Sequence, residues 1–128
     1  MLVVDAANVI GSRPTGWWRD RAGAARTFVG QVRAAVESGR IAQPVVVILE
    51  GEARAGVPAG EADGVTVLHA DGTGDDALVA VVADASDSDV TLVTADRELR
   101  RRAEALGAEV VGPGWLLDRL ESRSVGNG

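Results

Sequence analysis

The stretch Met1–Ile10, MLVVDAANVI, decides the fold, because four apolar residues run directly into a carboxylate, Asp5. A short apolar run without polar alternation is typical of a strand that is buried on both faces of a sheet. The same pattern returns in Val45–Leu49 (VVVIL), which is followed at once by Glu50, and in Val90–Thr94 (VTLVT). Buried strands of this kind predict a parallel sheet.

Helical patterns separate these strands. After a loop at Gly11–Gly16, apolar residues recur at spacings of three and four from Trp18 to Val36, which predicts a helix that ends at Gly39. Further elements are predicted as strands at Val65–Ala70 and Glu109–Val111 and as helices at about Asp75–Ala85, Asp96–Leu106 and Pro113–Leu120. We therefore expect a three-layer α/β/α domain with a central parallel sheet of about five strands. The strand order stays open at this point.

The composition is ordinary for a globular domain, with 128 residues, 46% hydrophobic and 25% charged. We expect one domain over residues 1–121 and a flexible tail at 122–128. No apolar run reaches the ~20 residues of a membrane span, and the start of the chain lacks the basic region of a signal peptide. These features predict a cytoplasmic protein that does not associate with membranes.

The residue types limit the metals that the chain can bind. There is no cysteine and only one histidine, His69, so thiolate sites and multi-histidine sites are excluded. His69 itself has no evident partner and is assigned no chemistry. A metal would be held by oxygen ligands, which favours a hard cation such as Mg²⁺ or Mn²⁺.

Acidic residues stand where the predicted strands end. Asp5 closes the first strand, Glu50 follows the second, and Asp96 follows the fourth by two residues, while Asp75 and Asp76 open the helix before the fourth strand. Ligands of open α/β sheets bind beyond the carboxyl ends of the strands, so these acids would meet there if the first, second and fourth strands are neighbours. Carboxylates held together repel one another, and a divalent cation relieves that repulsion.

A simpler interpretation of some of these acids is helix capping. An Asp at a helix start often accepts hydrogen bonds from free backbone N–H groups, and Asp75, Asp76 and Asp96 all stand at predicted helix starts. Taken singly, each is more often a cap than a metal ligand. Asp5 is different, because Ala6, Ala7 and Asn8 follow it and no helix is predicted there. The set as a whole favours a metal site.

Three motifs resemble those of a known superfamily. Asp5-Ala-Ala-Asn8-Val-Ile10 resembles the first-strand signature of the NYN branch of the PIN-like nucleases. Thr94-Ala-Asp96-Arg97 resembles the superfamily's Ser/Thr-x-Asp motif, and Gly74-Asp75-Asp76-Ala77-Leu78 resembles its helix-opening acid. Their order and spacing fit over nearly the whole chain, which looks most similar to the YacP-like NYN proteins of high-GC bacteria.

The resemblance implies a five-stranded PIN-like sheet and a ribonuclease that uses Mg²⁺ or Mn²⁺ to hydrolyse RNA phosphodiester bonds. It implies metal ligation by carboxylates, namely Asp5, Asp75, Asp96 and, as a further candidate, Glu50. Asn8 would orient Asp5 or the substrate phosphate, and Thr94 would support the loop that carries Asp96. The spacing to Leu78 favours Asp75 over Asp76, but both stay candidate catalytic residues. The acid that PIN toxins carry on an early helix has no counterpart here.

Arginine supplies all thirteen positive side chains of the sequence. Arg19, Arg26 and Arg33 are seven residues apart, so on one helix they would form a stripe, either for RNA phosphates or as stems packed along the core edge. Arg97 directly follows Asp96 and is the best-placed arginine to meet a phosphate. The predicted substrate-binding residues are Arg13, Arg19, Arg26, Thr94 and Arg97.

The tryptophans are given separate roles. Trp18 shares the apolar register of the long helix, so we expect it in the core, as we do Trp115 at the start of the last helix. Trp17 lies off that register and could stack on an unpaired base.

Several other classes of protein fail on particular residues. Haloacid-dehalogenase-like phosphatases and response-regulator receivers require a lysine, which this chain lacks, and a dinucleotide site requires a glycine-rich turn after the first strand. The alternative that stays open is a catalytically silent PIN-like domain that binds RNA or a protein. The missing early-helix acid and the net charge of −6 favour it. RNA is the expected partner in both cases, and a homodimer is possible.

Overall fold

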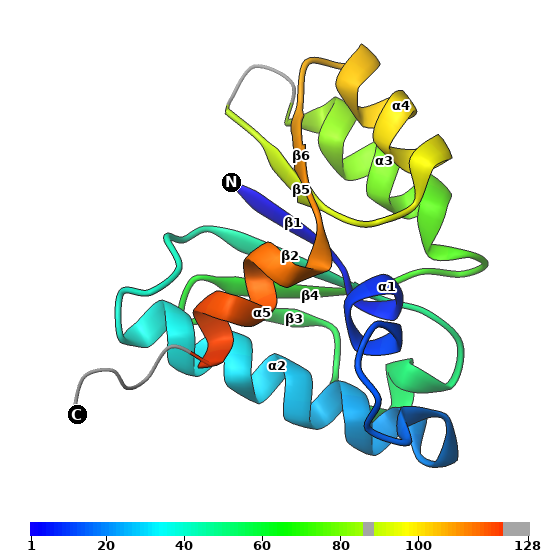
Figure 1. Ribbon diagram of the computed structural model, residues 1–128, viewed down its shortest axis with the longest axis vertical. Coiled ribbons are helices and arrows are strands. Elements are labelled where there is room, and N and C mark those ends of the chain that lie inside the picture. Colours follow the sequence, from blue (N-terminus) through cyan, green and yellow to red (C-terminus); the bar gives the residue numbers. More distant parts are fainter. Residues whose placement is uncertain (86–88, 122–128) are drawn as a thin grey trace.

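A six-stranded sheet in the order β3-β4-β2-β1-β5-β6 runs through the computed structural model, which describes residues 1–85 and 89–121 (Figure 1). The elements in chain order are β1 (Leu2–Asp5), α1 (Ala6–Gly11), the 3₁₀ helix η1 (Trp17–Arg19), α2 (Arg21–Glu37), β2 (Val45–Leu49), the 3₁₀ helix η2 (Gly51–Gly56), β3 (Gly60–Ala62), β4 (Val65–His69), α3 (Gly74–Asp84), β5 (Thr91–Val93), α4 (Arg97–Ala105), β6 (Glu109–Val111) and α5 (Pro113–Glu121). The tail predicted at 122–128 lies outside the described residues.

The strand order brings the predicted acidic positions to one edge. β1 pairs in parallel with β2 on one side and with β5 on the other, and Asp5 lies opposite Ile48 in the register. The first, second and fourth predicted strands are therefore neighbours, which is the condition for Asp5, Glu50 and Asp96 to stand along the same edge. The short β3, which the sequence did not predict, runs antiparallel to β4 at the border of the sheet.

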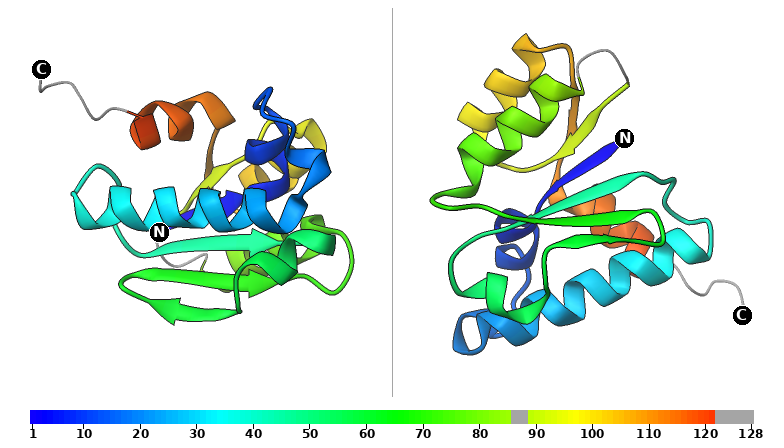
Figure 2. Two further views of the ribbon diagram at one scale, coloured as in Figure 1. Left: turned by 90° about the horizontal axis from the view of Figure 1, so that it is seen from below. Right: turned by 180° about the vertical axis from the view of Figure 1, so that it is seen from behind.

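Helices cover both faces of the sheet, as a three-layer α/β/α domain requires. One core cluster joins the sheet to α1, α2 and α5, and a second joins it to α3 and α4 (Figures 1 and 2). All four residues of β1 and all five of β2 are buried, so their unbroken apolar runs did identify strands covered on both faces. Within the described ranges, no helix is long and apolar enough to cross a membrane.

The region after β1 differs from the sequence prediction. A short helix, α1, begins directly after Asp5, although no helix was expected there. The long helix begins at Arg21 rather than near Trp18, because the Asp20 backbone is not helical (φ −151°, ψ 82°) and its carboxylate accepts a hydrogen bond from the Gly23 backbone N–H at 2.8 Å.

This change of helix start alters the expected surroundings of two tryptophans. Trp18 falls in η1, outside the apolar register of α2, and is 54% exposed, so its predicted place in the core is wrong. Trp17 instead packs against the core cluster beneath α1 and α2. Trp115 is partly buried against the same cluster, and the Arg119 guanidinium lies over its ring.

Candidate active site at the carboxyl ends of β1, β2 and β5

Asp5 is the buried acid of this edge. It is the last residue of β1 and is only 6% exposed. Its Oδ1 accepts a hydrogen bond from the Asn8 backbone N–H (3.3 Å), which makes Asp5 the N-cap of α1, and its Oδ2 accepts one from Thr94 Oγ1 (2.9 Å). Capping and chemistry are compatible here, because a carboxylate oxygen has a second lone pair for a further partner.

The surroundings of Asp5 disfavour its negative charge. Burial raises the pKa of the Asp5 carboxyl from 3.8 to about 6, against the lowering effect of the hydrogen bonds from Thr94 and Asn8. The charges of Asp75 and Glu50 are smaller causes of the same rise. Asp5 therefore lies near two other carboxylates in a poorly solvated place, an arrangement in which a bound cation would stabilise all three charges.

Asn8 and Thr94 tie the start of α1 to the loop between β5 and α4. The Asn8 side-chain Oδ1 accepts a hydrogen bond from the Ala95 backbone N–H (3.0 Å), so it holds this loop rather than contacting the Asp5 carboxylate. The buried Thr94 hydroxyl donates to Asp5 and also accepts from the Asp96 backbone N–H at 3.1 Å. Thr94 thus fixes both Asp5 and the loop that carries Asp96.

Asp96 acts as a helix cap. Its Oδ1 accepts a hydrogen bond from the Leu99 backbone N–H at 2.9 Å, at the start of α4. It stands along the same edge as Asp5, but the neighbouring charges that raise the pKa of Asp5 are those of Asp75 and Glu50.

The two acids that open α3 have different surroundings. Neither is the cap residue, which is Thr73. Asp75 is half-buried and acts electrostatically on Asp5. The Asp76 side chain is 88% exposed and forms an ion pair with Arg102 of α4, at 3.3 Å. Of the two, Asp75 is the one whose charge reaches Asp5.

Glu50 connects the end of β2 to the start of α3. Its Oε1 accepts a hydrogen bond from the Gly74 backbone N–H at 3.1 Å. A Cβ atom at Gly74 would lie 2.7 Å from the same oxygen, so a larger residue would push this carboxylate away. Glu50 is thereby held at the same helix start that carries Asp75.

The donor set fits a hard cation in its chemistry, because these acids offer only oxygen ligands. It is not gathered in advance, however. Over residues 1–85 and 89–121, no three His, Cys, Asp or Glu side chains are grouped so that they could hold one metal ion. Metal binding would require side-chain rearrangement at this edge.

The predicted substrate-binding arginines occupy different places. The Arg13 guanidinium donates to Gln31 Oε1 (3.1 Å) and to Glu121 Oε2 (3.2 Å), and its side chain is only 17% exposed, so it clamps the end of α1 to α2 and α5. Arg19 lies in η1 with its guanidinium 5.8 Å from the centre of the Trp18 ring. The stripe predicted for one helix is therefore broken, and only Arg26, which is exposed, and the partly buried Arg33 belong to α2.

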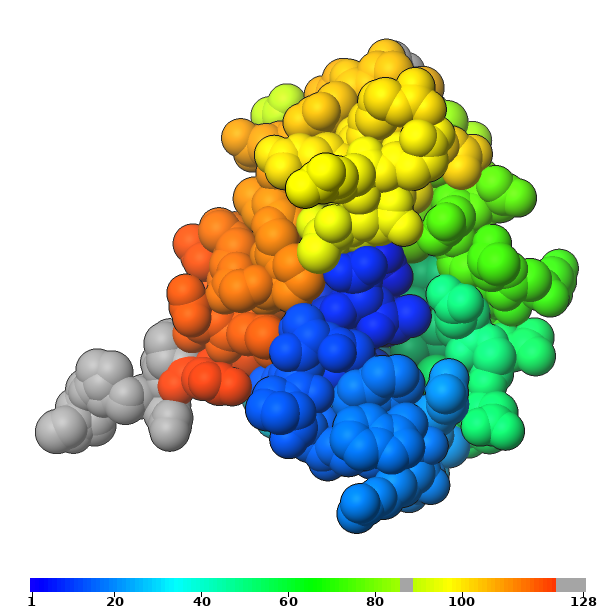
Figure 3. All heavy atoms as spheres, turned by 45° about the vertical axis from the view of Figure 1, so that its right-hand side comes forward, coloured from blue at the N-terminus to red at the C-terminus, as the bar shows by residue number. Residues whose placement is uncertain are grey.

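Arg97 is exposed at the first position of α4, beside the Asp96 cap. Arg21, the first residue of α2, was not among the predicted residues, and it lines a pocket next to Glu50. The sequence feature that could have indicated Arg21 is Asp20, because an Asp is a favourable N-cap and would place Arg21 at the first position of the helix. In the face of the molecule that Figure 3 shows, α1 lies in the middle, between the α4 region and the η1 region.

The order of the strands and the two helical layers are consistent with a PIN-like α/β/α fold. No protein-family model matches the chain, and no curated protein matches it. Among solved structures, it is similar to the crystal structure of Rae1 (YacP) from Bacillus subtilis, with a TM-score of 0.68 and 18% sequence identity. The match covers 94% of this chain and 74% of that one. The chain thus has a YacP-like fold, in agreement with the fold implied by its three motifs.

We expect Thr94→Val to destabilise the protein by about 1–3 kcal/mol, because valine keeps the shape but leaves the part-buried Asp96 N–H without its acceptor and the Asp5 Oδ2 without its donor. Urea denaturation at neutral pH measures this effect. Thr94→Ser is the matched control, since it retains the hydroxyl and both hydrogen bonds. A valine variant as stable as the serine variant would show that these hydrogen bonds do not support the edge.

Proposed function

We propose that the chain is a ribonuclease that hydrolyses RNA phosphodiester bonds with Mg²⁺ or Mn²⁺ at the edge formed by β1, β2 and β5. One observation carries the proposal. Asp5 is a buried carboxyl at the end of a central strand, with its pKa raised by burial and by the charges of two further acids. The crevice beyond strand ends is where open α/β sheets bind their ligands, and the sheet of this chain is of that kind.

The proposed ion would be held by Asp5, Asp75 and Glu50, with Asp96 as a further ligand. When bound, such an ion lowers the pKa of a water molecule and stabilises the charge that develops on the phosphoryl oxygens. The protein's own contribution is positioning. Thr94 holds Asp5 in one orientation, Asn8 holds the loop before α4, and the Gly74 backbone N–H holds Glu50. Asp76 faces Arg102 and is the weaker candidate of the pair that opens α3.

The second candidate function is a catalytically silent PIN-like domain that binds RNA or a protein. Two observations favour it. The acids are not grouped for an ion in the part of the chain that the structure describes, and the net charge is −6. The cytoplasmic location and the possible homodimer also stay predictions.

Calorimetric titration with Mn²⁺ separates these functions. We expect the purified protein to bind Mn²⁺, and we expect Asp5→Asn and Asp75→Asn each to lose this binding, because each removes a negative charge from the proposed ligand set. Asp118→Asn is the matched control, since it removes one exposed carboxylate on α5 that is outside the proposed ligand set. The single variant Asp76→Asn then decides between the two acids of α3. Absence of Mn²⁺ uptake by the unmodified chain would leave the nuclease without its metal and favour the binding module.

Cleavage is tested with single-stranded RNA in the presence of Mn²⁺. We expect shorter products with the unmodified protein and none with Asp5→Asn or with a chelator. Persistent inactivity on RNAs of varied sequence, despite bound Mn²⁺, would contradict the proposed activity.

A further inference from the structure

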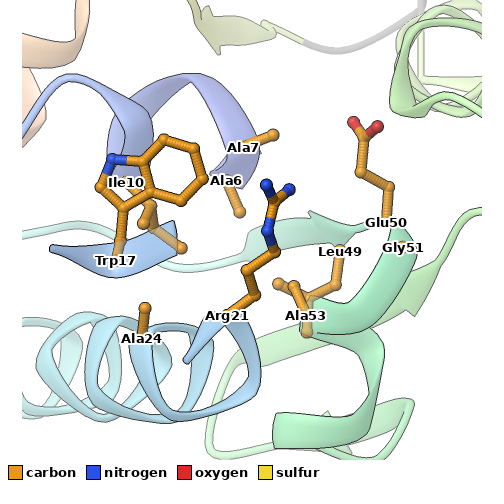
Figure 4. Close-up of a pocket in the computed structure, with 10 residues that line it drawn as sticks. All are labelled: Ala6, Ala7, Ile10, Trp17, Arg21, Ala24, Leu49, Glu50, Gly51 and Ala53. Atoms are coloured by element: carbon orange, nitrogen blue, oxygen red, sulfur yellow. The ribbon is translucent and has the colours of Figure 1, made fainter. Parts of the chain in front are cut away.

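A pocket of about 160 Å³ lies directly beside the acidic edge, between α1, the start of α2 and the segment that follows β2 (Figure 4). Most of its walls are apolar, and they include Ile10, Trp17, Leu49 and Ala53. Its polar side chains are Arg21 and Glu50. Because Glu50 also accepts the Gly74 hydrogen bond beside Asp75, the pocket and the acidic edge share one residue and form a continuous surface.

Arg21 is held so that its charge faces this pocket. Its guanidinium lies 5.1 Å from the centre of the Trp17 ring, and its Nε lies 3.9 Å from Glu52 Oε1. Figure 4 shows the Arg21 side chain rising from α2 between the indole of Trp17 and the end of β2. The side chain is still 50% exposed, so a ligand can reach it. The ring contact restricts the guanidinium without neutralising it.

Arg21 also places a positive charge next to the acids, where an anion can meet it. The chain carries a net charge of −6, and the adjacent edge holds Asp5, Glu50 and Asp75, so the local field repels phosphate. An arginine that forks to phosphate oxygens offsets this repulsion at short range. Arg21 is the arginine that shares a pocket with Glu50, whereas Arg13 is committed to Gln31 and Glu121.

The size and the walls of the pocket indicate which chemical group would bind there, next to a phosphate held by Arg21. Its volume is below the ~300–1,000 Å³ of sites for drug-sized ligands, so it suits a single planar group rather than a whole oligonucleotide. A base in a duplex is paired and stacked and cannot enter such a hollow, whereas an unpaired base can be splayed out against aromatic and aliphatic walls.

We propose that this pocket receives the base of an unpaired nucleotide next to the cleaved phosphodiester and that Arg21 binds a phosphate oxygen of that nucleotide. The inference rests on the proposed ribonuclease function and names the residues that would hold the nucleotide beside the cleaved bond. Arg21 and the pocket walls position the nucleotide and do not take part in the chemistry. This binding does not require the stripe of Arg19, Arg26 and Arg33 that the sequence suggested.

Metal-free binding measurements test this inference separately from cleavage. A fluorescein-labelled single-stranded RNA is titrated with protein in a chelator at low salt, and anisotropy gives the dissociation constant. We expect Arg21→Ala to weaken binding about tenfold and Arg21→Lys to restore only part of it, because lysine keeps the charge without the planar fork. Ala53→Leu narrows the pocket without changing its charge. We expect it to weaken binding about fivefold, because the base loses its contact with the pocket walls.

Arg100→Ala is the matched control. Arg100 is 57% exposed and, like Arg21, is paired with a glutamate, but it lies on the outer surface of α4. We expect the dissociation constant of Arg100→Ala for the RNA to stay within about twofold of that of the unmodified protein, because this variant removes the same charge at a distance from the pocket. Duplex RNA of the same sequence should bind at least about tenfold more weakly than the single strand.

The outcomes separate the two proposals. Equal losses in Arg21→Ala and Arg100→Ala, unchanged binding in Ala53→Leu, equal affinity for duplex RNA, or no RNA binding at all would each overturn the pocket inference. Cleavage that requires Asp5 but not Arg21 would overturn it while leaving the ribonuclease proposal intact. Single-strand binding that depends on Arg21 and Ala53, without any Mn²⁺-dependent cleavage, would support the pocket and contradict the ribonuclease.

Discussion

Asp5→Asn is expected to stabilise the metal-free protein at neutral pH while ending Mn²⁺ binding and RNA cleavage. The reason is that the folded protein holds Asp5 where its charged form is disfavoured. A carboxyl whose pKa rises from 3.8 to about 6 on folding lowers stability, when ionised, by up to about 3 kcal/mol. Asparagine avoids this cost, keeps an oxygen for the Asn8 N–H and can donate to the Thr94 hydroxyl. Sites that sacrifice stability for function show this trade-off.

The sign of the pH dependence gives a second measurement of the same effect. Because the folded pKa is above the unfolded one, the stability from protonating Asp5 is fully present below pH 3.8 and is lost as pH rises through about 6. Urea titrations from pH 4 to pH 7 should show the difference between Asp5→Asn and the unmodified protein growing with pH. Asp118→Asn, an exposed carboxylate on α5, provides the control. A constant difference across this range would contradict the raised pKa.

Gly56→Ala is expected to be the most damaging small substitution for the fold. The last residue of η2 lies so close to α2 that a Cβ atom there would be 2.0 Å from the Ala22 carbonyl oxygen, which is backbone and cannot turn aside. The two elements would have to separate, at a cost of about 3 kcal/mol. Thermal or urea denaturation measures this loss. Since η2 and α2 both line the pocket beside Glu50, a loss of RNA affinity should accompany it.

Gly30→Ala is the natural control for this prediction. Gly30 is exposed in the middle of α2, and a Cβ atom added there meets nothing within 4 Å. Alanine should therefore stabilise the helix by about 0.5–1 kcal/mol through its better helix propensity. If the two variants change stability alike, close packing of η2 on α2 is not what excludes a side chain at position 56.

The sheet could be predicted because its strands carry their own signal. The runs at Val45–Leu49 and Leu2–Asp5 are apolar at every position before the acid, and only a strand covered on both faces satisfies such a pattern. β3 could not be found in this way. Gly60–Ala62 is exposed along its whole length and forms only through pairing with β4, so no periodicity marks it.

The errors around the tryptophans have one physical cause. Apolar spacing from Trp18 onward continues the register of α2, but a helix starts where its backbone N–H groups find a cap, and Asp20 provides it. The chain between α1 and that cap turns at Gly16, whose φ is +72°, and this turn places Trp17 rather than Trp18 against the core. The spacing of apolar residues along the sequence does not predict this turn.

The acidic edge was predictable in outline and less so in detail. The motifs indicated which acids stand at the strand ends, and the strand order places Asp5 and Glu50 at the ends of neighbouring strands. The sequence favoured Asp96 over Glu50 as a partner of Asp5, whereas it is the charges of Glu50 and Asp75 that act on Asp5 in the structure. Side-chain direction decides this, and it depends on tertiary contacts such as the Gly74 hydrogen bond.

The central place of β1 has a consequence for the newly made chain. β1 precedes the other elements of this domain in the chain, yet the hydroxyl that fixes Asp5 belongs to Thr94, 89 residues later. β1 also needs β5 as its second neighbour, so the edge is assembled only after most of the domain has been translated and has folded. An incomplete or N-terminal fragment therefore presents scattered acids rather than a site, and any activity toward RNA begins only when the domain is whole.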